Sequence, residues 1–173
     1  EAKMLESLNQ LSAKKIIENE IEVIKSRQLL TEVAKKLHLY APVYEKGRSK
    51  PATAYTTSPI IIQAQNPDSL GNPGDVYFTV GPDTKWVQIG QDTFTVNKWV
   101  RTPYGVLRFV PQAHDKMPKD RPLYFNLEDP KVIATNLQAN LQAASVSKLS
   151  SVISLKVKDD NAKRAEDILN ALI

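Results

Sequence analysis

The middle of the sequence alternates short apolar runs with turn residues, and helical patterns flank it on both sides. The strand candidates in this part cover residues 59–64, 76–80, 85–89, 93–101 and 105–111, and turns that contain Gly or Pro separate most of them. Short strands with turn residues at roughly 8–12-residue spacing are typical of an antiparallel meander or a small barrel. The pattern therefore predicts a β-rich antiparallel unit, which we expect as an insert over residues 66–111.

Residues 13–38, ahead of the β-rich part, have the apolar spacing of a helix. The apolar stripe shifts by a residue or two near Ser26 and Arg27, which predicts a bend or a break into two helices at that point. A strand is expected over residues 39–44, between this helical segment and the insert.

After the insert, the sequence returns to alternating strands and helices. A strand is expected at residues 123–127, and Asp129-Pro130 has the residues of a helix start, with Asp as the N-cap and Pro in the first turn. Further strands are expected at residues 141–146 and 151–157. Asp159-Asp160 are expected to cap a last helix.

The two ends of the chain, each with helices and strands, are expected to share one sheet. The predicted fold class is therefore α+β, with helices packed on a mixed sheet that carries the β-rich antiparallel insert. The chain has 173 residues, which is the length of one domain, so we expect a single domain over residues 1–173. It has no cysteine, which excludes disulfides and thiolate metal sites.

The charge pattern gives little support to nucleic-acid binding, and we expect no nucleic-acid partner. The net charge is +4 and the pI is about 9.2, but the basic residues are spread along the chain instead of forming a cluster. No apolar run approaches the ~18–20 residues that cross a bilayer. The chain starts at Glu1 and its last helical pattern runs to Ile173 without a cap, so we expect a fragment of a longer protein.

Residues that could carry chemistry are few and dispersed. His38 lies at the end of a helix and His114 lies in a polar loop, and a surface position explains each better than a catalytic role. His114, Asp115 and Asp120 form the one candidate metal cluster, and it is weak. No glycine-rich phosphate loop occurs. We therefore expect that this chain is not an enzyme and has no catalytic residue, cofactor or metal.

Aromatic residues gather in the β-rich middle. Trp86, Trp99 and Tyr104 are the candidates for a sugar contact, because aromatic rings on a sheet can stack on sugar rings. The same residues can instead form the core of a small β unit, which is the commoner role for aromatic rings. A carbohydrate-binding β module is therefore the alternative function.

Two segments resemble signatures of the Wzz/Wzc-type polysaccharide co-polymerases. Residues 18–38 are similar to the first helical region of that family, with matching positions at Glu22, Val23, Ile24, Ser26, Arg27, Leu30, Val33 and Leu37. Residues 152–173 are similar to its second signature, a strand and a helix, with matching positions at Ile153, Leu155, Val157, Asp160, Ala165, Ile168, Leu169 and Asn170. The β-rich middle resembles the longer insert of the members that are fused to a cytoplasmic tyrosine kinase.

The resemblance implies the periplasmic domain of an inner-membrane protein, built on a Wzz-like base domain. Such proteins assemble into homo-oligomeric rings that regulate the chain length, polymerisation or export of surface polysaccharide. The implied partners are further copies of the chain and the polysaccharide polymerase or export machinery, while direct contact with polysaccharide is left open. In the kinase-linked branch, a cytoplasmic domain binds ATP and autophosphorylates on tyrosine, and its Walker-type motifs are absent from this sequence.

The first helical segment holds the candidate residues for contacts between subunits. These are Glu22, Ser26 and Arg27, on one face of the segment, because Arg favours ion pairs at interfaces. An ordinary solvated helix face is the alternative interpretation of the same three residues.

Overall fold

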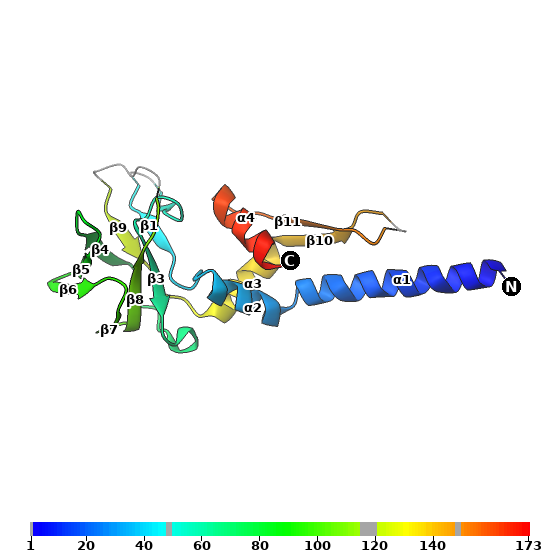
Figure 1. The fold of residues 1–173 in the computed structure, drawn as a ribbon, viewed down its shortest axis with the longest axis horizontal. Coiled ribbons are helices and arrows are strands. Elements are labelled where there is room, and N and C mark those ends of the chain that lie inside the picture. The colour runs from blue at the N-terminus through cyan, green and yellow to red at the C-terminus, as the bar shows by residue number, and fades with distance from the viewer. Residues whose placement is uncertain (1, 48–49, 115–120, 148–149) are drawn as a thin grey trace.

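The computed structural model describes residues 2–47, 50–114, 121–147 and 150–173. The molecule is elongated, with most of its strands at one end and the first helix projecting at the other (Figure 1). The helices are α1 (Ala2–Ile24), α2 (Arg27–Lys36), the 3₁₀ turn η1 (Pro67–Ser69), α3 (Pro130–Asn140) and α4 (Ala162–Ala171). The strands are β1 (Val43–Glu45), β2 (Ala52–Thr53), β3 (Ile60–Ala64), β4 (Val76–Val80), β5 (Trp86–Ile89), β6 (Asp92–Thr95), β7 (Trp99–Thr102), β8 (Gly105–Pro111), β9 (Leu123–Phe125), β10 (Leu141–Ser145) and β11 (Ile153–Val157).

Capping explains where the first two helices meet. α1 ends at Ile24, and the Ser26 side chain accepts a hydrogen bond from the Leu29 N–H at 3.3 Å at the start of α2. Ser26 is therefore an N-cap, which satisfies one of the free N–H groups in the first turn of the helix. The predicted break near Ser26 and Arg27 is confirmed.

The later helices start in two different ways. α3 starts as predicted, because the Asp129 carboxylate accepts a backbone hydrogen bond at 2.8 Å and Pro130 is the first helical residue. α4 has Asn161 as its N-cap, whose side chain accepts from the Arg164 N–H at 2.9 Å. The prediction that Asp159-Asp160 cap this helix is therefore wrong. The Asp159 carboxylate pairs instead with the Arg164 guanidinium.

Two antiparallel sheets form the β part of the molecule, which we define as β1 to β9. One sheet has six strands in the order β2-β1-β9-β4-β5-β6, and the other has three in the order β3-β8-β7. Buried residues of both sheets, including Ile62, Phe109 and Phe125, form one core. Every strand pair in the described ranges is antiparallel, so the α+β class holds but the expected mixed sheet is not found.

The strand expected over residues 93–101 is in fact two strands, β6 and β7, which belong to different sheets. The chain turns between them at Asn97, whose φ of 60° lies in the left-handed region. Asparagine tolerates this conformation, and the Asn97 N–H donates to the Phe109 carbonyl at 2.8 Å. One residue thus lets the chain pass from one sheet to the other. The strand expected over residues 39–44 also differs from the one observed, since only β1, Val43–Glu45, is a strand in that part of the chain.

The expected insert over residues 66–111 lies within the β part and shares its sheets with strands from outside that range. Phe125 of β9 lies opposite both Val43 of β1 and Val76 of β4. β3, which precedes the range, pairs along its length with β8, which lies inside the range. Both flanks of the range therefore help to build the β part.

A second core lies among α2, α3, α4 and the β10–β11 hairpin. It contains Leu30, Ala34, Ala134 and Ile168, each at most 1% exposed. β1, from the first end of the chain, lies in the six-stranded sheet. Among the described residues, β10 and β11 pair only with each other. The two ends share a sheet through β1 and β9, which pair with each other, but β10 and β11 lie outside it, so the predicted shared sheet is found only in part.

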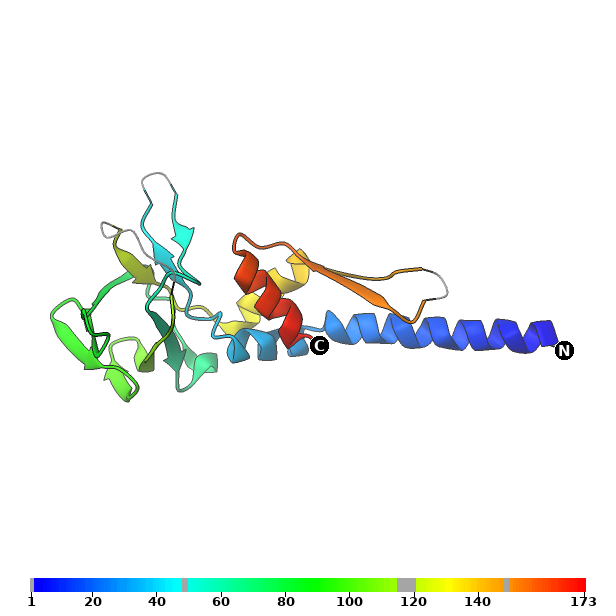
Figure 2. The same ribbon diagram turned by 45° about the horizontal axis from the view of Figure 1, so that its top comes forward.

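α1 extends away from both cores. The β10–β11 hairpin projects in the same direction as α1 and lies above the C-terminal half of that helix (Figure 2). Although α1 has 23 residues, it is not apolar enough to span a membrane, and the other helices of the described ranges are no candidates for a span either.

Candidate functional site

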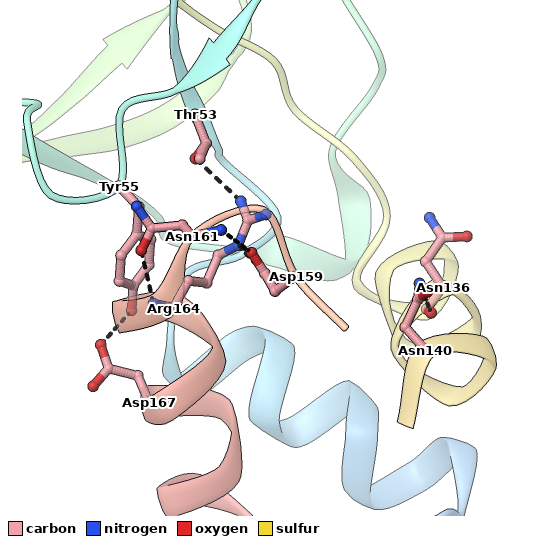
Figure 3. Close-up of polar contacts among 8 residues, drawn as sticks. All are labelled: Thr53, Tyr55, Asn136, Asn140, Asp159, Asn161, Arg164 and Asp167. Carbon is pink, nitrogen blue, oxygen red and sulfur yellow. Dashed lines mark hydrogen bonds and ion pairs between the residues drawn. The ribbon is translucent and has the colours of Figure 1, made fainter. Parts of the chain in front are cut away.

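A cleft of about 970 Å³ separates the β part from helices α3 and α4. Figure 3 shows polar residues on both sides of it: Thr53 and Tyr55 from the β part, Asn136 and Asn140 from α3, and Arg164 and Asp167 from α4. Apolar side chains such as Leu137 and Ile168 also line it. The lining therefore mixes polar and apolar side chains in comparable numbers, and the volume lies within the range of ligand-binding sites.

Arg164 connects the two sides of the cleft. Its Nε donates to both carboxylate oxygens of Asp159, at 3.0 and 2.8 Å, and its Nη1 donates to Thr53 Oγ1 at 3.2 Å. The Arg164 and Asp159 side chains are 20% and 8% exposed. Because both charges are largely removed from water, each depends on the other for its stability. The pair therefore holds the start of α4 against β2.

A second polar contact joins the same two parts of the molecule. The Tyr55 hydroxyl donates to Asp167 Oδ2 at 2.8 Å, and Lys163 Nζ lies 3.1 Å from the other oxygen of the same carboxylate. Burial, together with the nearby Asp167 carboxylate, raises the pKa of Tyr55. The phenol therefore stays protonated, as its role as a donor requires.

Among the side chains that line the cleft without a hydrogen-bond partner in the described ranges, four can both reach a ligand and come from separate parts of the chain. They are Tyr44 on β1, Asn136 on α3, and Lys158 and Asp160 between β11 and α4. Burial raises the pKa of the Tyr44 phenol, which therefore remains a neutral donor. Since these groups come from three separate elements, a ligand in the cleft could bind all three elements at once.

The charges around the cleft nearly balance. The basic residues that line it are Lys158, Lys163 and Arg164, and the acidic residues are Glu128, Asp159, Asp160 and Asp167. Two of the three basic side chains are already paired with acidic ones. The cleft thus offers hydrogen bonds rather than a net charge of either sign.

The structure covers the weak metal cluster only in part. His114 is exposed, and its Nδ1 lies 3.2 Å from the Gln112 carbonyl. Asp115 and Asp120 lie outside the described residues. Within the ranges that are described, no group of three or more His, Asp or Glu side chains is placed to hold a metal ion.

The aromatic residues predicted for a sugar contact lie apart from one another. Trp86 is on the six-stranded sheet and packs against Gly81, where an added Cβ would lie 2.5 Å from the indole. Trp99 is on the three-stranded sheet, and the Arg108 guanidinium covers its ring at 4.9 Å. Tyr104 follows β7 and packs against the β core. The structure therefore does not bring these residues together, and the cleft is lined by other residues.

The residues predicted for subunit contacts lie where α1 meets α2. Glu22 and Arg27 are exposed, while Ser26 is half-buried and caps α2. Glu22 and Arg27 are thus free to meet another surface, whereas Ser26 has a local structural role.

A half-buried polar network surrounds His38, which follows α2 with a φ of 54°. Its Nδ1 lies 3.1 Å from the Tyr40 hydroxyl and its Nε2 lies 3.0 Å from Gln63 Nε2. The Gln63 oxygen accepts from the Arg108 guanidinium at 2.6 and 2.8 Å, so the Gln63 amide nitrogen must donate to His38. His38 Nε2 is therefore an acceptor, and the imidazole is neutral in this arrangement.

This network predicts that the free energy of unfolding falls as the pH is lowered through about 6.5, the usual pKa of histidine. Burial, and then the Arg108 charge, lower the pKa of His38 in the folded protein. In that pH range the unfolded chain gains a proton that the folded chain does not accept, which favours unfolding. Urea unfolding at pH 7.5 and pH 5 measures the effect. His38→Asn, which suits the positive φ, should flatten this dependence, whereas His114→Asn should retain it.

Sequence reasoning missed the cleft and the pairs that form it. Asp159 and Arg164 are close enough in sequence to have suggested a local pair. Their neighbours in the β part lie far away, since Thr53 is 111 residues from Arg164 and Tyr55 is 112 residues from Asp167. No local pattern identifies partners at such a separation.

Comparison with known proteins found no family model that matches the chain and no curated protein that is similar to it.

Proposed function

We propose that this chain is a scaffold and oligomerisation domain, whose copies associate through α1. In this proposal it is the periplasmic domain of an inner-membrane protein that regulates the chain length, polymerisation or export of surface polysaccharide. The parent protein carries a cytoplasmic tyrosine kinase. The apolar surface of α1 is the single observation that supports the proposal most strongly.

α1 exposes apolar side chains along its first half. Met4, Leu8 and Leu11 have the spacing i, i+4, i+7, which places them on one side of a helix. They are 72%, 57% and 64% exposed. A row of large apolar side chains in contact with water is a mark of an interaction site.

The opposite side of α1 already has a partner. Ile17, Ile21 and Ile24 are half-buried where α1 approaches α2 and β10. At 100° per residue, these positions face away from the row of Met4 and Leu8. α1 is thus apolar on the side that its own chain covers and also on exposed sides, where Leu5, Ile16 and Val23 lie next to the row of Met4, Leu8 and Leu11. A second copy of the chain is the partner that explains the exposed sides.

The two sequence signatures supply the biological context of the proposal. The resemblance to polysaccharide co-polymerases links a helical scaffold to surface polysaccharide and to the periplasm. It also names the other partners, which are the polysaccharide polymerase or the export machinery. Glu22, near the C-terminal end of α1, and Arg27, the first residue of α2, remain the proposed sites of ion pairs between copies.

Cysteine cross-linking tests the proposed contact. The chain has no cysteine, so Leu8→Cys introduces a unique thiol within it. In the full gene product, with any cysteine outside this chain replaced, mild oxidation of the Leu8→Cys variant should give a covalent dimer on a non-reducing gel.

Glu6→Cys is the matched control, because Glu6 lies on the same helix about 160° away from Leu8. It should give little dimer under the same conditions. Equal cross-linking of the two variants, or none for either, would contradict the proposal that copies meet on the Leu8 side of α1.

A further inference from the structure

We propose that the cleft between the β part and helices α3 and α4 binds an uncharged saccharide. This inference goes beyond the assembly function and does not depend on it. It also differs from the sugar contact expected from the sequence, because Trp86, Trp99 and Tyr104 are not among the residues that line the cleft.

The size and the lining of the cleft suit a short oligosaccharide. Its volume of about 970 Å³ is at the upper end of the range for ligand sites, roughly 300–1,000 Å³. Apolar side chains, including Ile133, Leu137 and Ile168, line it beside the polar groups. Sugar rings present apolar C–H faces between their hydroxyl groups, so they match a surface of this mixed kind.

The unpaired polar groups match the chemistry of hydroxyl groups. Lys158 only donates hydrogen bonds, Asp160 only accepts them, and the Asn136 amide and the Tyr44 hydroxyl do both. Each hydroxyl group of a sugar can also donate and accept. These four side chains converge on one cleft from three elements and can therefore hold several hydroxyl groups of one ligand.

The charge balance argues against an anionic ligand. The Arg164 guanidinium is bound to Asp159 and Thr53, and Lys163 is bound to Glu166 and Asp167. Four carboxylates line the cleft against three basic groups, so a phosphate or uronate would meet an excess of negative charge with only the Lys158 ammonium free to offset it. An uncharged ligand meets no such penalty.

Titration of the chain with defined tetrasaccharides, followed by amide NMR shifts, tests the proposal. The neutral probes are cellotetraose, maltotetraose and chitotetraose, and tetragalacturonate is the anionic comparison. At least one neutral probe should shift residues of the cleft with a Kd below about 1 mM, and tetragalacturonate should bind more weakly. Asn136→Ala and Asp160→Ala should each weaken binding by about tenfold, which corresponds to about 1.4 kcal/mol or one hydrogen bond.

Thr135→Ala is the matched control, because Thr135 is exposed on α3 and is not among the residues that line the cleft. It should leave the affinity unchanged. Asn136 and Asp160 are also exposed, so their variants should keep the wild-type fold, which the NMR spectrum itself reports.

Three results would overturn the saccharide site. These are no shift with any neutral probe at about 10 mM, tighter binding of tetragalacturonate, and equal affinity of the cleft variants and the control. None of these results bears on α1. If the Leu8→Cys variant cross-links but the chain binds no saccharide, only the saccharide site is refuted. If the chain binds saccharide but the variant does not cross-link, only the assembly function is refuted.

Discussion

Replacement of Arg164 by alanine should lower the free energy of unfolding by about 3 kcal/mol, the usual effect of removing one partner of a buried ion pair. The reason is the environment of Asp159, whose side chain is only 8% exposed and whose two oxygens both accept from the Arg164 Nε. The variant leaves this carboxylate with one backbone hydrogen bond, from the Asn161 N–H at 2.8 Å. It also removes the contact with Thr53 across the cleft. Urea unfolding followed by circular dichroism measures the loss.

Lys163→Ala is the matched control for this prediction. Lys163 precedes Arg164 on α4 and also forms ion pairs, but its side chain is 52% exposed. Exposed pairs contribute little, so this variant should stay close to the wild-type stability. The double variant Asp159→Ala/Arg164→Ala should recover part of the loss, because it removes the unpaired carboxylate. Equal stability of the two single variants would show that the Arg164 pair does not hold α4 in place.

The parts of the fold that depend on neighbouring residues were predicted well. The break at Ser26 and the start of α3 at Asp129 both follow from a side chain that caps the helix directly after it. The strand at residues 60–64 was placed correctly because a continuous apolar run between turns is a local pattern. Such features need no knowledge of the rest of the chain.

The parts that depend on distant residues were not predicted. Asp159 does not cap α4 because its carboxylate is bound by the Arg164 guanidinium, which in turn donates to Thr53, 111 residues away in the sequence. The division of residues 93–101 into two strands depends on the left-handed turn at Asn97 and on its bond to Phe109 of another strand. The cleft is a product of such distant contacts, so it could not be read from the sequence.

Replacement of both Leu8 and Leu11 by glutamate should have the largest effect on function, because it should abolish assembly. Burial of one leucine contributes about 1.5–3 kcal/mol, and each contact between copies would lose two of them. The loss corresponds to an association at least about a hundredfold weaker, before the cost of burying a charge is added. Both side chains are more than half exposed in the single chain, so its own fold should be unaffected.

Gln10→Glu/Ala13→Glu is the matched control for the added charge. Both positions are exposed on α1, and they lie about 130° and 170° around the helix from the midpoint between Leu8 and Leu11. The control also adds two negative charges to the helix. If general repulsion were responsible for a loss of assembly, the two double variants would behave alike.

The mass of the full gene product in detergent solution, measured for the wild type and for these two double variants, tests the central claim most directly. We expect the wild type and Gln10→Glu/Ala13→Glu to form the same oligomer. We expect Leu8→Glu/Leu11→Glu to have the mass of a single chain or of a much smaller assembly. An oligomer of unchanged mass in the Leu8→Glu/Leu11→Glu variant would contradict the account, because the apolar side of α1 would then not join the copies.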